Sequence, residues 1–290
     1  MTPTYPTSEL ILNKDGSMYH ISLRPQDISD VILTVGDPSR VHRVSQYFDE
    51  VTFEMNKREF ITHTGLYKGK KLTVMSTGMG TDNVEILMTE LDALANINLK
   101  KRENKTKRKA LKIIRIGTSG ALQQDVPLDS LLVSQYAIGL DTLMYFYKLE
   151  RTEAEQNVEA AFQLENELPF RPYCVEGSSS LFRHFSEETL AGNTVTCPGF
   201  YAPQGRQLRV PIRYPDIVDK LAAFHYGDLW LTNFEMETAG YYALGRLFGH
   251  EVISCNAIIA NRNTKQFSKN ADKTIDKLIK YVLEKTLTLE

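Results

Sequence analysis

A seven-residue stretch late in the chain, FYAPQGR at 200–206, combines side chains suited to holding a flat polar object. Gln204 carries an amide with donor and acceptor groups, and Arg206 carries a planar cation with five donors. Because these residues are two positions apart, an extended backbone would project both to the same side. The ring of Phe200 would form an aromatic wall beside them. The alternative is a surface loop that contains only a proline turn.

Glycine-rich turns follow three apolar runs: GDPSR (36–40), STGMG (76–80) and IRIGTSGA (114–121). Gly36 could bring its backbone close to a ligand, and Arg40 supplies a cation nearby. Arg115 lies inside a predicted strand, with Thr118 in the turn expected after it. Such turns expose backbone N–H groups, which hydroxyls and arginines complete into an anion cradle. Each alone is most often merely a turn, but three together, two with arginine, indicate an oxyanion site.

None of these turns matches GxxxxGK[ST], and none is a full GxGxxG with a downstream acid, so nucleoside triphosphate and dinucleotide sites are disfavoured. A further stretch, NFEMETAG at 233–240, places Glu235 and Glu237 around Met236 at an expected helix start. The acids could simply favour the helix dipole. Alternatively, one carboxylate could accept hydrogen bonds from a vicinal diol such as ribose, with Met236 against the sugar. The residues alone leave both interpretations open.

Strand and helix patterns alternate along the chain with no linker, repeat or low-complexity tract. Strands are predicted at 31–36, 71–78, 111–117, 131–139, 193–197 and 251–260. Helices are predicted after residue 78 and at 152–166, 215–227, 235–249 and 268–287. The first 20 residues are polar and turn-rich, and residues 1–17 are expected to form an irregular N-terminal arm. The pattern predicts one α/β domain with helices around a parallel or mixed sheet, and ligands at the loops beyond the strand ends.

Composition excludes several classes of protein. Of 290 residues, 42% are apolar and 24% are charged, as in ordinary globular proteins. The net charge of -2 argues against a duplex nucleic-acid binder. Three widely spaced cysteines form no metal-binding or disulfide pattern, which favours a reducing compartment. Because no signal peptide or membrane-spanning run is recognisable, we expect a soluble, cytoplasmic protein without a membrane partner.

Six motifs occur in one order: GDPSR, KREF at 57–60, STGMG, RIGTSGA, FYAPQGR and EMET at 235–238. Together they resemble the nucleoside phosphorylase superfamily, and are most similar to its uridine phosphorylases. The resemblance spans roughly residues 18 to 285. It implies a single nucleoside phosphorylase domain over 1–290, with a three-layer phosphorylase/hydrolase-like fold in which helices flank a central mixed sheet. FYxxQGR is the discriminating motif, because the family holds uracil with its glutamine and arginine.

The resemblance also implies roles for single residues. The phosphate-binding positions are Gly36, Arg40, Arg58, Arg115 and Thr118. The ribose-binding positions are His20, Met236 and Glu237, and the base-binding positions are Phe200, Gln204 and Arg206. Arg206, Gln204 and Arg115 would be catalytic, while Arg262 would hold the base-binding loop. Since His20 and Arg58 would serve a neighbouring subunit, the resemblance implies a homo-oligomer, a dimer at least and up to a hexamer.

The reaction implied is reversible phosphorolysis of uridine to uracil and ribose 1-phosphate in pyrimidine salvage, with deoxyuridine as a further candidate substrate. Inorganic phosphate would be the nucleophile and co-substrate, so no cofactor or metal is required, although some relatives place a monovalent cation such as potassium near the positions of Glu59 and Ser76. Purine phosphorolysis is disfavoured because 254–264 lack the aspartate that would bind the purine. A nucleosidase conflicts with the retained arginines, and a non-catalytic nucleoside-binding protein remains open.

Two segments depart from the family pattern. Thr81 replaces a glycine that many members have after STGMG. Residues 98–112, NLKKRENKTKRKALK, form a strongly basic insertion where a short connection is expected. We expect a solvated surface loop there, because no aromatic residue interleaves the charges as nucleic-acid binding would favour.

Overall fold

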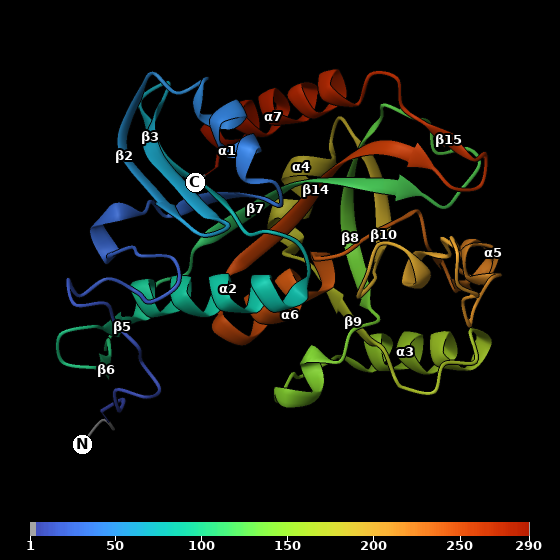
Figure 1. Ribbon diagram of the computed structural model, residues 1–290, viewed down its shortest axis with the longest axis horizontal. Coiled ribbons are helices and arrows are strands. Elements are labelled where there is room, and N and C mark those ends of the chain that lie inside the picture. The colour runs from blue at the N-terminus through green and yellow to red at the C-terminus, as the bar shows by residue number, and fades with distance from the viewer. Residues whose placement is uncertain (1–3, 290) are drawn as a thin grey trace.

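The computed structural model describes residues 4–289 (Figure 1), so residues 1–3 of the arm expected at 1–17 lie outside it, as does residue 290. Its α-helices are α1 (Pro38–Ser45), α2 (Thr81–Asn96), α3 (Glu153–Glu165), α4 (Ser179–Ser186), α5 (Ile217–Ala223), α6 (Thr238–Phe248) and α7 (Ala271–Leu287). Short 3-10 helices are η1 (Pro25–Asp27), η2 (Leu143–Phe146) and η3 (Ala202–Gln204). No helix of this part of the chain is long and apolar enough to cross a membrane.

The strands range in length from two residues, as in β5, to eleven residues in β14. The first eight are β1 (Val31–Val35), β2 (Glu50–Lys57), β3 (Phe60–Tyr67), β4 (Lys70–Ser76), β5 (Ile97–Asn98), β6 (Glu103–Asn104), β7 (Lys112–Ala121) and β8 (Leu131–Gly139). The others are β9 (Tyr173–Glu176), β10 (Leu190–Thr196), β11 (His225–Tyr226), β12 (Leu229–Trp230), β13 (Asn233–Glu235), β14 (Glu251–Asn261) and β15 (Gln266–Phe267).

Eleven of these strands form one mixed sheet in the order β15-β14-β8-β10-β13-β7-β1-β4-β3-β2, with β9 paired to β8. Because β7 also pairs with β14, the strands β7, β14, β8, β10 and β13 close into a ring. The strands β1, β4, β3 and β2 extend from β7 as an open wing. The mixed sheet confirms the predicted fold class.

Strand β7 changes its neighbour half-way along one edge. Residues 112–115 pair with β1, which runs parallel, and 120–121 pair with β13, which runs antiparallel. Since β1 and β13 approach from opposite directions, their carboxyl ends face each other across residues 116–119. The opposite edge of β7 stays paired with β14 throughout. The loops after β1 and β13 are therefore brought to one place, as expected for a ligand site at strand ends.

Helices cover both faces of the sheet, giving three layers (Figure 1). Helices α1, α4 and α7 lie on one side, and α2, α3 and α6 on the other. Helix α7 packs on β14 and β7 through the predicted apolar stripe of Ile275, Leu278, Ile279 and Val282, which is buried. Helix α2 packs along α6, and the N–H of Gly80, directly before α2, donates to the side chain of Glu237, directly before α6. The two helix N-termini are therefore close together.

The apolar runs predicted as strands are confirmed as β1, β4, β8, β10 and β14. The predicted end of the third strand is wrong. Residues 118–121 (TSGA) do not form a turn but are the last part of β7, which ends at Ala121. Pairing to both β14 and β13 holds these small residues extended. Thr118 consequently lies in a strand rather than in a turn.

The helix predicted at 215–227 is shorter than its sequence signals indicate. Helix α5 begins at Ile217 and ends at Ala223. Gly227 does not end the helix, because it lies with a φ of 58° between β11 and β12. This is the left-handed conformation that glycine tolerates in a tight hairpin turn.

Residues 50–67 form the β2–β3 hairpin, for which no strand was predicted. Strand β2 has no fully buried residue, since it is an edge strand, and its pattern lacks a compact apolar run. The turn of the hairpin contains Arg58 with a φ of 54°. The KREF motif is therefore the tip of an edge hairpin.

The basic segment 98–112 is largely exposed, as predicted, but it is not only a solvated loop. Strands β5 and β6 form a small hairpin within it. Arg102 donates to the carbonyls of Tyr5 at 2.7 Å and Pro6 at 2.8 Å and also to that of Leu10. Lys105 donates to the carbonyl of Ala95 in the last turn of α2. The segment therefore ties the N-terminal arm to the end of α2.

Candidate active site

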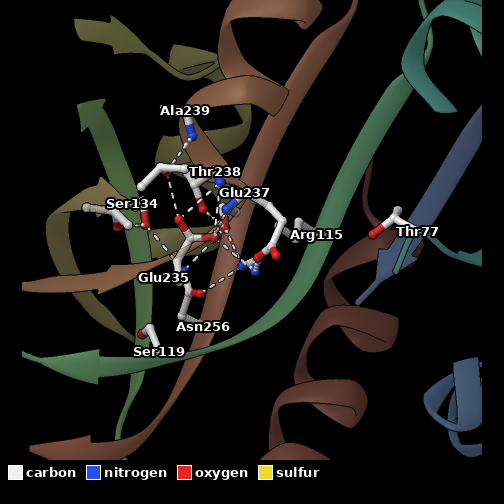
Figure 2. Close-up of polar contacts among 12 residues, drawn as sticks. Thr77, Arg115, Ser119, Ser134, Glu235, Glu237, Thr238, Ala239 and Asn256 are labelled. Carbon is white, nitrogen blue, oxygen red and sulfur yellow. Dashed lines mark hydrogen bonds and ion pairs between the residues drawn. The ribbon is translucent and has the colours of Figure 1, made fainter. Parts of the chain in front are cut away.

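Arg115 lies on β7 beside the gap between β1 and β13, and its side chain is buried. Its Nη2 lies 2.9 Å from Oε2 of Glu235 and 2.5 Å from Oε2 of Glu237. Its Nη1 donates to Oδ1 of Asn256 on β14 at 3.0 Å. Figure 2 shows these groups converging on one guanidinium. Burial acts to lower the pKa of Arg115, but Glu235 and Glu237 together raise it above its ordinary value.

Glu235 is fully engaged by protein donors. Its carboxylate accepts the hydroxyl of Thr196 at 2.7 Å. It also accepts the backbone N–H groups of Glu237 and Thr238, which lie beside it in Figure 2. With Arg115 added, this uses the acceptor capacity of both oxygens. Of the two alternatives that the sequence left open, an acid at a helix start describes Glu235, because its carboxylate binds the N–H groups at the N-terminus of α6. Its remaining effect is to hold Arg115 and the backbone of Glu237 in place.

Glu237 keeps acceptor capacity. Its Oε2 meets Arg115, and its Oε1 accepts the N–H of Gly80 at 2.8 Å, at the N-terminus of α2. Gly80 has a φ of 94°, which a side chain would strain. Burial raises the pKa of Glu237, Arg115 opposes this, and the charge of Glu235 adds to it. Since each carboxylate oxygen can accept two hydrogen bonds, Glu237 can still receive a pair of donors such as a vicinal diol.

Arg40 is the second cation at the gap. Its Nη1 donates to the carbonyl of Ile116 at 3.2 Å, an oxygen on the stretch of β7 that lacks a strand partner on this edge. Burial lowers the pKa of Arg40 to about 10, and the like charge of Arg115 acts in the same direction. Two neighbouring guanidiniums with this mutual repulsion provide a favourable environment for an anion.

The two glycine turns predicted to cradle an anion lie side by side. A Cβ on Gly36 would be 3.4 Å from the carbonyl oxygen of Gly78. The turn after β1 and the STGMG turn after β4 therefore adjoin each other, next to Arg40.

Two further predicted site residues are half-buried. Thr118 lies on β7, in the stretch between its pairings with β1 and β13. Met236 lies in the chain between Glu235 and Glu237.

Gln204 and Arg206 are brought together, but not by the extended backbone that the spacing suggested. Residues Ala202–Gln204 form η3, and Gly205 follows in the left-handed conformation with a φ of 65°. This tight turn leaves Nη1 of Arg206 2.6 Å from Oε1 of Gln204. Gln204 is 3% exposed, and its carbonyl accepts from Nη1 of Arg262 at 2.8 Å. Arg262 therefore holds the loop, as expected.

Phe200 lies beside this pair with half of its surface exposed. The guanidinium carbon of Arg206 is 3.8 Å from the centroid of the Phe200 ring, so the cation stacks on the aromatic face. Burial, and then the like charge of Arg262, lowers the pKa of Arg206 to about 10. A ligand that gains negative charge here would relieve that unfavourable burial.

The loop that carries Phe200, Gln204 and Arg206 continues directly from β10. The last residue of that strand, Thr196, donates to Glu235, and the next, Cys197, donates its N–H to the carbonyl of Glu235. Strand β10 also pairs in register with β13. The loop with Gln204 and Arg206 therefore follows β10, and Glu237 follows the adjacent parallel strand β13.

His20 and Arg58 lie together elsewhere on the chain. The guanidinium of Arg58 is 5.9 Å from the ring centroid of Tyr19, whose ring meets that of His20 edge-on at 4.8 Å. Within residues 4–289, neither side chain makes a hydrogen bond or ion pair with Arg115 or Glu237. The structure does not bring these two predicted site residues to the Arg115 cluster of their own chain.

Glu59 and Ser76, predicted near a monovalent cation, are direct neighbours. The hydroxyl of Ser76 donates to the carbonyl of Glu59 at 2.5 Å and accepts the N–H of Ile61 at 2.8 Å. The arrangement joins the β2–β3 hairpin to the end of β4.

Residues 30–285 match the sequence model of the phosphorylase superfamily. The chain belongs to this superfamily. A uridine phosphorylase of Thermococcus kodakarensis is 30% identical over 276 residues, which cover 94% of this chain and 88% of that protein. A DeoD-type purine nucleoside phosphorylase of Streptococcus suis is 27% identical over 271 residues, covering 91% and 97%.

Solved structures of the superfamily share the fold. A Trypanosoma brucei nucleoside phosphorylase, described as showing uridine phosphorylase activity, superposes with a TM-score of 0.88 at 27% identity, covering 97% of this chain and 100% of its own. A purine nucleoside phosphorylase of Toxoplasma gondii superposes with a TM-score of 0.66 at 19% identity, covering 95% and 97%. The fold and the nucleoside phosphorylase class of this chain are thereby shown.

Sequence reasoning missed several residues that shape the site. Asn256 is a polar residue in the middle of the mostly apolar strand β14, and this could have singled it out. Thr196 lies in a strand that also contains Asn193 and Thr194, so its polarity alone does not mark it. Gly80 was recognised only as part of a turn, although its N–H orients Glu237. Glu90 contacts His20 from α2, and no local signal marks it.

Proposed function

We propose that this protein catalyses the reversible phosphorolysis of uridine to uracil and ribose 1-phosphate. The observation that carries the proposal is the Gln204–Arg206 pair, joined at 2.6 Å on the loop that follows β10, the strand paired with β13 and hence beside the segment that carries Glu237. Uracil has two carbonyl acceptors with an N–H donor between them. An amide can meet a carbonyl and the N–H, while a guanidinium donates to a carbonyl oxygen.

The chemistry needs no covalent enzyme intermediate, because phosphate is itself the nucleophile. Arg40 and Arg115 would hold phosphate next to the sugar, which removes much of the entropic cost of bringing two reactants together. Negative charge grows on the departing uracil in the transition state. Arg206 would stabilise that charge more strongly than it stabilises the neutral base, which is the condition for rate acceleration.

Glu237 would bind the ribose hydroxyls with the acceptor capacity that Arg115 and Gly80 leave. Because Glu237 and Arg115 are direct partners, binding of the sugar and binding of phosphate would be coupled. Deoxyuridine, which keeps one of the two ring hydroxyls, is proposed as a second substrate.

We also propose a homo-oligomer, a dimer at least, in which His20 and Arg58 serve the site of a neighbouring subunit. Among the described residues, their side chains contact Tyr19 and Glu90 and make no hydrogen bond or ion pair with Arg115 or Glu237 of their own chain, which supports this arrangement. A potassium ion near Glu59 and Ser76, and a cytoplasmic role in pyrimidine salvage, complete the proposal.

Purine phosphorolysis is the second candidate, favoured by the 27% identity to the Streptococcus suis enzyme. Residues 254–264 contain no aspartate that could bind a purine ring nitrogen. This difference in the base-binding region supports uridine over a purine nucleoside.

Release of the free base from uridine and from inosine, each with and without phosphate, tests the function. We expect uracil release that requires phosphate and little hypoxanthine release. Phosphate-independent release would indicate a nucleosidase, a preference for inosine would indicate the purine reaction, and binding without turnover would indicate a non-catalytic protein.

Arg206→Ala tests the residue that carries the proposal. Loss of one such charge-stabilising donor lowers kcat by about a hundredfold or more. The matched control is Arg209→Ala, which removes an exposed arginine three positions further on. Near-full activity of Arg206→Ala would reject the assignment.

A further inference from the structure

Glu90 holds the segment that carries His20. Its carboxylate, on α2, accepts the backbone N–H of His20 at 3.0 and 3.1 Å and that of Ile21 at 2.9 Å. Its Oε1 also lies 2.7 Å from Nδ1 of the His20 ring. Glu90 is only 7% exposed, so these contacts are made away from bulk water. One carboxylate therefore fixes both the backbone and the ring of His20.

This contact determines which nitrogen of the ring carries a proton. An ionised carboxylate accepts hydrogen bonds and has none to donate, so Nδ1 of His20 must be the donor. In the neutral ring the lone pair is then on Nε2. The His20 side chain is 28% exposed, and Tyr19 and Arg58 lie on the same surface. Nε2 is thereby left as an acceptor on a ring whose orientation is fixed.

We propose that Glu90 is a positioning residue: it locks His20 as the Nδ1–H tautomer, so that Nε2 accepts a hydrogen bond from the 5′-hydroxyl of the nucleoside bound in a neighbouring subunit. The inference rests on the proposed function for the identity of that hydroxyl. Glu90 itself touches no substrate.

An amide cannot replace this carboxylate. The donors that converge on Glu90 are two backbone N–H groups and one ring N–H, and the side chain introduced by Glu90→Gln would offer only one oxygen. In one outcome, the NH2 group of the glutamine faces an N–H donor and the contact is lost. In the other, the His20 ring changes to its second tautomer, in which Nδ1 accepts from the NH2 group and Nε2 carries the proton. Nε2 is then a hydrogen-bond donor and no longer an acceptor. A buried carboxylate at this position is therefore specific to the Nδ1–H tautomer.

The kinetic test compares uridine with 5′-deoxyuridine, which lacks the hydroxyl. For Glu90→Gln and His20→Ala, kcat/KM for uridine should fall by about tenfold, the cost of one lost hydrogen bond, while kcat/KM for 5′-deoxyuridine changes less than about twofold. The double variant should be no worse than His20→Ala, because Glu90 acts through the ring. The control is Glu85→Gln, because Glu85 lies on the same helix but accepts the hydroxyl of Tyr147 instead of contacting His20. This variant should preserve the ratio of kcat/KM for uridine to kcat/KM for 5′-deoxyuridine.

Equal losses on both substrates, or additive losses in the double variant, would show that Glu90 has only a structural role and would overturn the inference. Nitrogen NMR of the His20 ring gives a readout that needs no substrate. We expect the Nδ1–H tautomer in the unaltered protein and its loss in Glu90→Gln; an Nε2–H or doubly protonated ring in the unaltered protein overturns the proposal. Absence of uracil release by the unaltered protein would reject the proposed function instead, while the NMR result would still decide the Glu90–His20 pairing.

Discussion

Nη2 of Arg115 lies 2.5 Å from Oε2 of Glu237. The cation predicted to bind phosphate and the carboxylate predicted to bind ribose are therefore direct partners. Both are buried, and each shifts the pKa of the other toward its charged form. A change at either residue should therefore alter binding of both co-substrates.

The pH dependence of the reaction should report on Glu237. Burial raises the pKa of this carboxyl above its ordinary value of 4.5. As pH falls through that raised value, Glu237 gains a proton and loses both its charge toward Arg115 and one acceptor site. We expect kcat/KM for uridine to be full above the raised pKa and to decline below it. Glu237→Gln should be much less active and should lack this decline in a profile taken from neutral to acid pH.

Glu235 should matter for stability as well as activity, because it accepts hydrogen bonds from Thr196 and two backbone N–H groups in a buried site. Glu235→Gln places an NH2 group against these donors and removes a charge next to Arg115. We expect the free energy of unfolding to fall by about 1–3 kcal/mol in a urea titration. Glu165→Gln, an exposed change at the end of α3, should stay within about 0.5 kcal/mol, and an equal effect of both would contradict the assignment.

Arg102→Ala should release the N-terminal arm. The guanidinium donates to the carbonyls of Tyr5, Pro6 and Leu10, and no other side chain in the described chain donates to those three oxygens. We expect faster hydrogen exchange and easier proteolysis at residues 5–10, with little change in the control Arg108→Ala, which alters an exposed arginine of the same segment. Unchanged exchange in Arg102→Ala would show that the arm is held by other contacts.

The contacts of Arg102 also predict the effect of deleting residues 101–108. A solvated loop could be removed without loss of activity, but this deletion removes Arg102 and Lys105 as well. The arm leads into His20. If His20 serves the site as proposed, the deletion should lower kcat/KM for uridine and leave 5′-deoxyuridine less affected.

The parts of the site that follow apolar strands could be predicted from the sequence, because a glycine turn after such a run marks a strand end. Gly36, Arg40 and Arg115 were found in this way. The resemblance then supplied roles for Gln204 and Arg206, although the spacing argument for their proximity was wrong. Their contact depends on η3 and the left-handed Gly205, which a two-residue period does not describe.

Long-range relationships account for what could not be predicted. The pairing of β7 with both β1 and β13 sets two strand ends against each other, and neither strand carries a signal of this arrangement. Arg102 lies in a run of cations, where a solvated side chain is the ordinary expectation. Its carbonyl partners are more than 90 positions away in the chain. Contacts of this kind depend on tertiary structure, not on local pattern.

Gly117 should be required for the position of Arg115. A Cβ built on Gly117 would be 1.9 Å from Nη1 of Arg115, whereas one on Gly120 of the same strand would meet its nearest atom at an ordinary 3.6 Å. Because Arg115 is held by Glu235, Glu237 and Asn256, it cannot give way without breaking buried contacts. Gly117→Ala should therefore lower kcat/KM for uridine by about tenfold or more, equivalent to about 1.4 kcal/mol.

The matched variant Gly120→Ala adds the same methyl group to the same strand without that collision, so it should keep activity within about twofold. Urea unfolding of both proteins separates displacement of Arg115 from general loss of fold. If Gly117→Ala were as active as Gly120→Ala, the guanidinium would have room to move while remaining functional. The fixed position assigned to Arg115 between its two carboxylates would then be incorrect.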